Sequence, residues 1–185
     1  MFACIHTMNR RTSHPGLDGV ADGYVLEEVG RSRTTVVSLW PTQAGARAAA
    51  AAGVLGATVV RDEVYQVEED IPGPAAADEP GAAALLDFDG PQGPARIAAA
   101  RRAFHNRLGP VLRQTPGLVR VLVLWQPETC AHVVLTIAVS LPALADIGKA
   151  VDTTQLLPGE DPALLPGPDR AAINQITAHR QGVLR

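Results

Sequence analysis

The sequence predicts an α+β protein built from two β-α-β-β-α-β units in tandem, and two observations carry this prediction. Segments of strand and helix character recur in the same order on either side of a stretch rich in proline and glycine, which indicates a weak internal duplication. Hydrophobic residues make up 46% of the 185 residues, enough for one sizeable core. We therefore expect a first half over residues 1–70, a linker over residues 71–83 and a second half over residues 84–185.

The first half is predicted to be abbreviated. Residues 9–23, where the unit should have its first helix, are rich in glycine, arginine and aspartate and show no helical stripe of apolar residues. We therefore expect this helix to be short or lost. The other elements are expected to be a strand, a hairpin that turns at Gly30, an alanine-rich helix and a last strand, at residues 2–7, 24–40, 42–52 and 59–68.

The second half keeps every element of the unit. Ile97, Phe104 and Leu108 recur at helical spacing and form one apolar stripe. Pro110 should kink or split this helix, because it has no N–H to donate to the carbonyl of Asn106. In order, the predicted elements are a strand, a helix, a hairpin, a helix and a strand, at residues 84–88, 94–114, 118–140, 142–152 and 171–179.

The return strand of this second hairpin has two different faces. The odd positions from 131 to 139 are aliphatic, whereas His132, Thr136 and Ser140 make the even positions smaller and more polar. The outgoing strand is apolar at nearly every position, which indicates burial on both faces. We therefore expect a barrel wall with helices outside, and with the more polar face, His132 included, lining a semi-polar lumen.

Two segments rich in proline and glycine interrupt the pattern. Residues 71–81 show no apolar periodicity, so we expect them to be extended and exposed. Residues 157–168 precede the last strand, and their leucines indicate a loop that packs against something. Long loops in compact domains often border functional clefts, so two readings stay open, a cleft border and an inserted packing loop.

Charge and composition argue against several classes of partner. The net charge of −3 and the pI near 5.9 do not fit a nucleic-acid partner. No apolar run approaches the roughly 20 residues that span a bilayer, and no signal peptide is recognisable, so we expect no membrane partner and a cytoplasmic location. Cys4 and Cys130 lie far apart without CxxC spacing, so neither a disulfide framework nor a metal site is indicated.

Residues 113–125 (RQTPGLVRVLVLW), which follow the helix that carries Phe104, resemble the antibiotic biosynthesis monooxygenase-like domains. A fainter echo lies at residues 36–42 (VVSLWPT), where that family often ends its third strand in a tryptophan. The resemblance implies a ferredoxin-like fold whose sheets pair as an α+β barrel. A tandem copy would complete this barrel within one chain, so the protein is expected to be a monomer or a homodimer.

The family includes cofactor-independent oxygenases of polycyclic aromatic substrates and haem-degrading enzymes. Haem degraders of this type use an asparagine on the first strand, a tryptophan after the third and a histidine on the second helix. Trp40 matches the tryptophan, but residues 43–52 and 142–152 contain no histidine, and the first strands offer Thr7 or Asp89 where asparagine would stand. Because haem iron needs a strong axial ligand, we expect no haem and no other cofactor.

Three kinds of side chain are candidates for a site: two histidines as general base, two arginines as anion stabiliser and two tryptophans as pocket walls, namely His132 and His105, Arg101 and Arg120, and Trp40 and Trp125. Each has a structural alternative. His105 could lie on a solvated helix face, His132 could be exposed at a hairpin end, and the tryptophans could be core residues. His6, which shares a strand face with Cys4, is expected to be a core histidine.

These residues predict a cofactor-independent monooxygenase-like protein that acts on a small aromatic or polyketide-like substrate. Such a protein would deprotonate its substrate and stabilise the carbanion while it reacts with oxygen in a dry pocket. The alternative is a non-catalytic barrel that binds a small ligand or is purely structural. An open lumen that contains a histidine favours the enzyme, whereas a lumen packed shut by valine, leucine and tryptophan favours the structural protein.

Overall fold

The computed structural model describes residues 1–9, 17, 20, 22–52 and 59–182. Its strands are β1 (Phe2–Met8), β2 (Asp22–Glu28), β3 (Thr34–Trp40), β4 (Val59–Pro72), β5 (Ala82–Phe88), β6 (Leu118–Gln126), β7 (Ala131–Ala138) and β8 (Arg170–Arg180). Its helices are α1 (Gln43–Ala52), α2 (Pro94–Ala103), α3 (Gly109–Leu112) and α4 (Leu141–Asp152), with a π-helical turn η1 (Phe104–Leu108) between α2 and α3 and a 3₁₀ turn η2 (Pro162–Leu164). Within these described ranges, no helix is long and apolar enough to cross a membrane.

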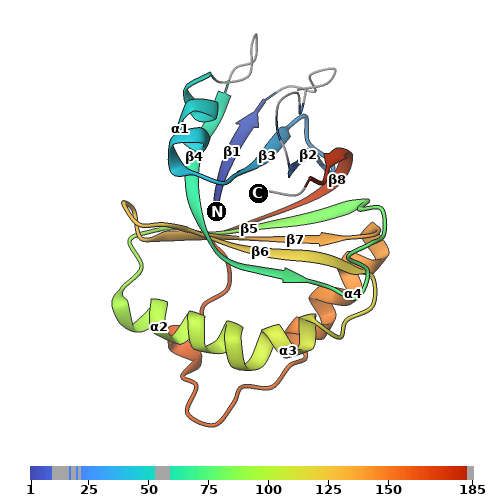
Figure 1. Ribbon diagram of the computed structural model, residues 1–185. Coiled ribbons are helices and arrows are strands. Elements are labelled where there is room, and N and C mark those ends of the chain that lie inside the picture. The colour runs from blue at the N-terminus through green and yellow to red at the C-terminus, as the bar shows by residue number, and fades with distance from the viewer. Residues whose placement is uncertain (10–16, 18–19, 21, 53–58, 183–185) are drawn as a thin grey trace.

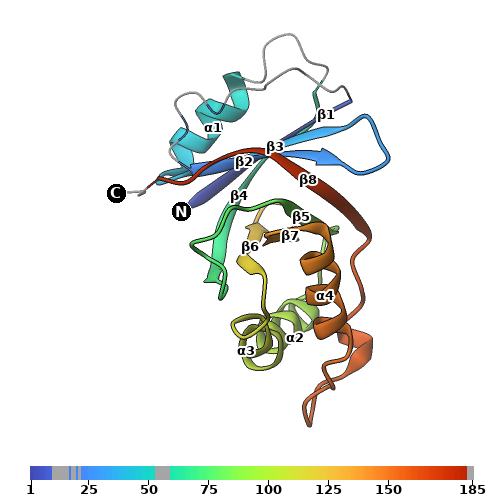
Figure 2. The same ribbon diagram turned by 90° about the vertical axis from the view of Figure 1, so that its right-hand side faces the viewer.

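The described strands close into one antiparallel barrel in the order β1-β3-β2-β8-β5-β7-β6-β4. Each half contributes four neighbouring strands in the same order, β4-β1-β3-β2 from the first half and β8-β5-β7-β6 from the second. The two halves join because the last strand of each pairs with the other half, β4 with β6 and β8 with β2. The barrel lies between α1 on one side and α2, α3 and α4 on the other (Figure 1, Figure 2). The predicted α+β barrel is therefore confirmed.

The middle of the lumen is filled by apolar side chains, and the polar face of β7 does not line it, which corrects the predicted place of His132. Ile5, Leu122, Leu135 and Ile137 are fully buried in the cluster that fills it. These positions put the aliphatic face of β7 inside, so His132 points outward toward the helices. The physical reason is that a polar group in a dry lumen would have no water to bind, so the more apolar face of β7 is the one that faces inward.

Arginine side chains occupy positions near opposite ends of β4. Arg61 pairs with Asp87 (2.6 Å) and Glu63 (2.5 Å), and its guanidinium also donates to the hydroxyl of Tyr65. The second arginine, Arg120, lies on β6 where that strand pairs with the end of β4. Because Tyr65 belongs to the lumen cluster, the first network covers apolar residues of the core.

The helix predicted over residues 94–114 is divided into α2, η1 and α3. The backbone N–H of Gly109 donates to the carbonyl of Phe104, which is the spacing of a π-helical turn. Pro110 follows directly and has no N–H of its own, so the expected break near this proline is confirmed.

The linker segment is more buried than predicted. β4 continues to Pro72, and Ile71 and Ala75 are only 3% and 7% exposed. The backbone N–H of Ala75 donates to the carbonyl of Leu118 (2.9 Å), so this part of the linker packs against β6 and the expectation of exposure is wrong there. The expected loss of the first helix over residues 9–23 falls mostly outside the described residues.

Candidate functional site

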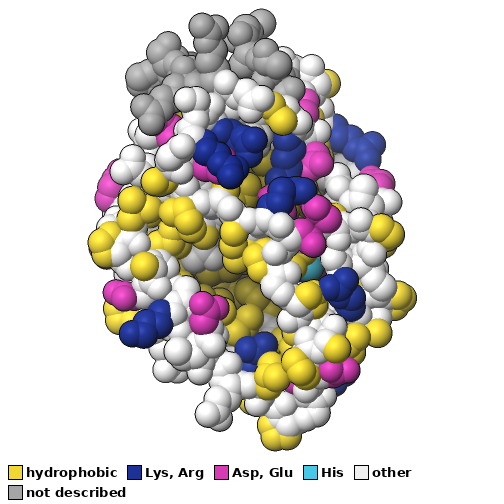
Figure 3. Space-filling model, turned by 180° about the vertical axis from the view of Figure 1, so that it is seen from behind, with side chains coloured by type: hydrophobic (Ala, Val, Ile, Leu, Met, Phe, Trp, Pro, Cys, Tyr) yellow, Lys and Arg dark blue, Asp and Glu magenta, His cyan; other side chains and the backbone are white. Residues whose placement is uncertain are grey.

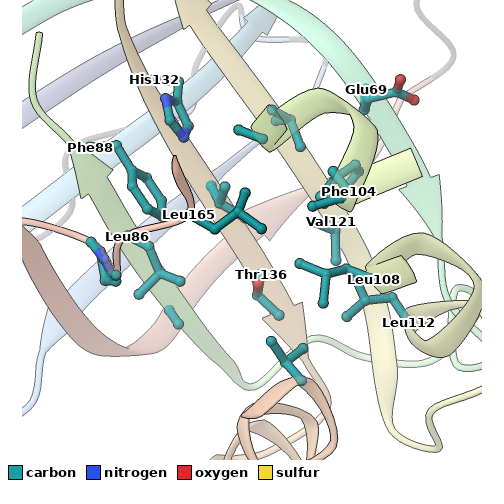
Figure 4. Close-up of a pocket in the computed structure, with 18 of the residues that line it drawn as sticks. Glu69, Leu86, Phe88, Phe104, Leu108, Leu112, Val121, His132, Thr136 and Leu165 are labelled. Carbon is teal, nitrogen blue, oxygen red and sulfur yellow. The ribbon is translucent and has the colours of Figure 1, made fainter. Parts of the chain in front are cut away.

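A cavity of about 1390 Å³ lies between the outward face of the second half's sheet and its helices. Figure 3 shows a hollow with a hydrophobic floor on the face of the molecule seen from behind, and Figure 4 shows the side chains that point into the cavity. The sheet contributes Leu86, Phe88, Val121, Val123, Trp125, His132, Val134 and Thr136, and the helical side contributes Ile97, Phe104, Leu108 and Leu144. Apolar side chains therefore form most of the wall.

Strand alternation explains which residues reach this cavity. On β5 and β7 the even-numbered residues face it, and on β6 the odd-numbered residues do, because the opposite positions fill the lumen. Thr136 is the other polar residue that β7 presents beside His132. The prediction that β7 has one aliphatic and one more polar face is thus confirmed. The prediction that the more polar face lines the lumen is wrong, because the aliphatic face lies there.

His132 is the imidazole that the sheet presents to the cavity, and Glu68 and Glu69 of β4 also line it. Its ring stacks on Phe88, with ring centres 4.2 Å apart and an angle of 8° between the planes (Figure 4). Burial lowers the pKa of His132 from its ordinary value; Glu68 and Asp169 oppose this shift and Arg96 adds to it. At neutral pH the imidazole is therefore uncharged, the form that accepts a proton from a substrate.

Two arginines of α2 line the same cavity in different states. Arg101 is paired with Glu68, and its guanidinium carbon lies 5.6 Å from the centre of the Trp125 ring, over the ring face. Arg96 has a buried Nε atom with no hydrogen-bond partner among the described residues. Arg96 is thus a cation with an unsatisfied donor at the cavity, and it was missed in the sequence, where nothing distinguished it from the other arginines.

The structure brings together four of the six predicted site residues. His132, Trp125 and Arg101 line the cavity, and His105 lies at its exposed rim. Trp40 does not belong to it. Its side chain lies against Gly45 of α1, in the first half, and its Nε1 donates to Ser38 Oγ (2.9 Å).

Arg120 is also misplaced by the sequence prediction. It donates to Asp22 (2.8 Å), Asp70 (2.8 Å) and the hydroxyl of Tyr24 (3.2 Å), and it does not line the cavity. Its charge is therefore neutralised by two carboxylates. Its assignment as an anion stabiliser in the same site as His132 is wrong.

The loop between α4 and β8 covers part of the cavity. Leu156, Leu164, Leu165 and Pro166 line it, and Leu165 lies over β7 in Figure 4. The loop is anchored by a pair between Arg107 Nε and Glu160 Oε2 (2.8 Å), whose side chains are 11% and 6% exposed. Of the two readings left open by the sequence, the cleft border is the one observed.

Comparisons with known proteins show what this chain resembles in fold. No family model matches the sequence, and no curated protein matches it. A candidate monooxygenase of Fusobacterium nucleatum superposes with a TM-score of 0.60 at 8% identity, over 97% of this chain and 94% of its own. An anthrone oxidase-like protein gives a TM-score of 0.59 at 14% identity, over 98% and 93% of the two chains.

A third structure connects the fold to a family. It is a ferredoxin-fold protein of Listeria monocytogenes related to antibiotic biosynthesis monooxygenases, with a TM-score of 0.51 at 9% identity over 96% of this chain and 95% of its own. At such identities the likeness concerns the fold. This chain thus shares its fold with monooxygenase-like proteins, one of which is a ferredoxin-fold protein related to antibiotic biosynthesis monooxygenases.

Proposed function

We propose, from the premise that the chain has the fold of antibiotic-biosynthesis-monooxygenase-like proteins, that it is a cofactor-independent oxygenase of a flat, polycyclic aromatic substrate. One observation carries the proposal: the large apolar cavity has an uncharged imidazole, that of His132, stacked on its wall. Apolar pockets with few polar groups are the usual binding sites of small organic ligands.

The walls fit an aromatic ligand. Phe88, Phe104 and Trp125 supply ring faces and edges, against which fused rings pack in offset or edge-to-face contact. The cavity exceeds the roughly 300–1,000 Å³ of typical ligand pockets, so three or four fused rings can enter. The substrate class is therefore an anthrone or a related polyketide, in which a CH₂ group lies between aromatic rings and opposite a carbonyl.

His132 acts as the base in this scheme. Its neutral ring takes a proton from the CH₂ group, and the resulting charge spreads onto the carbonyl oxygen, where the Arg96 guanidinium stabilises it. The carbanion then reacts with O₂ and forms a C–O bond, giving a peroxide that takes the proton back from the imidazolium. Loss of the second C–H proton breaks the O–O bond, leaving a carbonyl and one water.

These reaction steps balance in atoms and electrons without a cofactor. The CH₂ carbon loses four electrons as it becomes a carbonyl carbon, and one O₂ gains four as its atoms become the carbonyl oxygen and the water oxygen. The protein supplies only the base, the cation and the dry wall.

Turnover of 1,8-dihydroxy-9-anthrone tests the proposal, with oxygen uptake and quinone absorbance measured together. Replacing His132 by Phe keeps a ring against Phe88 and removes the base, so we expect a loss of about 100-fold or more in kcat/KM. His179→Ala is the matched control, because His179 pairs with Glu79 (3.2 Å) and does not line the cavity. A His132→Phe variant as active as the control would exclude His132 as the base.

His105 is the second candidate base. It lies at the exposed rim, farther from the apolar floor, so we expect His105→Gln to change kcat/KM by less than about tenfold. If kcat/KM falls more in His105→Gln than in His132→Phe, His105 is the base instead of His132.

A non-catalytic protein that binds a ligand or is purely structural is the alternative, and two observations favour it. The lumen is filled by apolar side chains, which is the outcome expected of a structural barrel. Among the described residues, no hydrogen-bond acceptor orients the His132 ring, whereas catalytic imidazoles are usually held by such a partner. If the protein only binds the ligand, added anthrone should quench Trp125 fluorescence, and oxygen uptake should not exceed the rate in buffer alone. Stoichiometric quenching without oxygen uptake would therefore contradict the oxygenase proposal and support the ligand-binding alternative.

We also propose that the chain arose from tandem copies of one ferredoxin-like unit and completes its barrel without a partner. The repeated strand order supports this proposal, and so does the pairing between the halves, of β4 with β6 and of β2 with β8. Light scattering over a dilution series tests it, since an obligate dimer would dissociate and unfold on dilution.

A further inference from the structure

A second cluster of reactive side chains lies in the first half, away from the cavity. Cys4 and His6 are two residues apart on β1 and share its outward face, because Ala3 and Ile5 fill the lumen. Asp62 of β4 stands directly opposite His6 in the β1–β4 register. The helix α1 packs against both strands.

The three side chains form a chain of close contacts. Cys4 Sγ lies 3.2 Å from His6 Nε2, and His6 Nδ1 lies 3.3 Å from Asp62 Oδ1. One donor atom from each residue falls within 4.8 Å of the other two. His6 Nδ1 is buried and makes no aligned hydrogen bond within the described residues, so the imidazole is not fully satisfied by its neighbours.

A thiol, an imidazole and a carboxylate in a row also form the arrangement of a cysteine nucleophile with its base. Burial and the nearby Asp62 charge raise the pKa of the Cys4 thiol to about 12. The residue is also 0% exposed, so no substrate reaches its sulfur. A protonated and inaccessible thiol is not a nucleophile, which excludes this role.

We propose that Cys4, His6 and Asp62 bind a divalent metal ion of the zinc class. Thiolate and imidazole are the ligands that zinc prefers, and three protein ligands plus water is a common zinc arrangement. Zinc–ligand bonds of about 2.0–2.3 Å in tetrahedral geometry put the ligand atoms about 3.5 Å apart. The upper limit of 4.8 Å on the observed spacing therefore needs a contraction of about 1.3 Å at most.

The Asp62 side chain can move to bring the ligand atoms closer together, and it also lies on the path by which an ion enters. Its side chain is 35% exposed, whereas His6 is 5% exposed, so the ion reaches the buried ligands past the carboxylate. Binding displaces the thiol proton and ties β1 to β4 next to α1. The site is independent of the proposed oxygenase, and either assignment can fail without the other.

Titration of the metal-free protein with Co²⁺ tests the site, because cobalt in a tetrahedral site with a thiolate ligand gives a charge-transfer band and visible d–d bands. We expect saturation at one equivalent, loss of the charge-transfer band in Cys4→Ser, and at least tenfold weaker binding in Asp62→Asn. Cys130→Ser is the matched control, because Cys130 lies in the β6–β7 turn and contacts Pro127 instead. Zinc should displace the cobalt, and at equal zinc concentration it should raise the melting temperature of the wild type more than that of Asp62→Asn.

Three outcomes would overturn the proposal. They are a wild type without a thiolate band, an Asp62→Asn variant that binds cobalt as tightly as the wild type, and a band that depends on Cys130 rather than Cys4. Circular dichroism establishes that each variant is folded. If Cys4→Ser does not fold, Asp62→Asn decides alone, since its change is isosteric and its side chain is partly exposed.

Discussion

Arg120 illustrates how the partners of a single residue determine its role. Its side chain is 13% exposed and lies between Asp22, which is 4% exposed, and Asp70. Both carboxylates hold the pKa of the guanidinium above its ordinary value despite its burial. The residue therefore joins β2, β4 and β6 and contributes to stability rather than to chemistry.

Replacing Arg120 by Ala should cost about 3–5 kcal/mol of unfolding free energy, because the buried Asp22 carboxylate is left without its cation. Urea unfolding at neutral pH measures this loss. Arg113→Ala, at an exposed position after α3, is the control and should change stability by less than about 0.5 kcal/mol. A loss for Arg120→Ala as small as that of the control would show that the network is not stabilising.

The lowered pKa of His132 predicts a dependence of stability on pH. The unfolded chain takes up a proton at the ordinary histidine value of 6.5, whereas the folded protein does so only at a lower pH. Below about pH 6.5 the unfolded state therefore binds more protons, and stability falls as the pH falls. Urea unfolding at about pH 7.5 and about pH 5.5 should show a larger loss for the wild type than for His132→Phe. Equal losses in both proteins would mean that the ring is not desolvated.

At the scale of single residues, the sequence identified some of the residues that line the cavity and misplaced others. His132 was named from strand alternation and Trp125 from its place at a strand end, and both line the cavity. Trp40 also lies at a strand end, that of β3, so the sequence could not separate the two tryptophans. Arg96 is distinguished by a buried, unpartnered Nε, a property that only packing creates.

The loop between α4 and β8 is the element that turns a sheet surface into a cavity. It supplies an apolar wall, and the Arg107–Glu160 pair attaches that wall to η1. Glu160 Oε2 also accepts a hydrogen bond from the backbone N–H of Leu157 (2.9 Å), so the same carboxylate fixes the start of the loop.

Glu160→Gln should loosen this wall and weaken ligand binding by about tenfold, because the buried guanidinium loses its charge partner. The dissociation constant of 1,8-dihydroxyanthraquinone, followed by Trp125 fluorescence, measures the effect. Glu128→Gln is the control, since Glu128 and its partner Arg47 are both more than half exposed. Unchanged affinity in Glu160→Gln would show that the anchor does not shape the cavity.

At the scale of elements, the order of strands and helices could be predicted because each has a local signature. Proline at the start of α2, the alternation in β7 and the turn at Gly30 (φ 78°) are examples. The direction in which β7 faces could not be predicted, since it depends on which layer covers each side. The length of β4 was underestimated because its last residues are held by β6, which is distant in sequence.

The two halves of the molecule share a strand order but differ in what covers their sheets. The alanine-rich α1 has little side-chain volume and packs closely on β1, whereas the longer α2–η1–α3 segment stands over the cavity with α4 (Figure 2). The packed lumen holds the strands of the two halves together as a scaffold. In this account, the second half carries the ligand site and the first half carries the cysteine–histidine–aspartate cluster.

The most direct test of the central claim locates a bound aromatic ligand by NMR. 1,8-Dihydroxyanthraquinone, which cannot react further, is added to the protein while the His132 ring signals, assigned with His132→Phe, are followed. We predict saturation at one equivalent, a ring-current shift of His132, and contacts between the ligand and the methyl groups of Thr136 and Leu165, which flank the same cavity. Shifts confined to residues of the first half, or no shift at a saturating ligand concentration, would contradict the assignment of this cavity as the functional site.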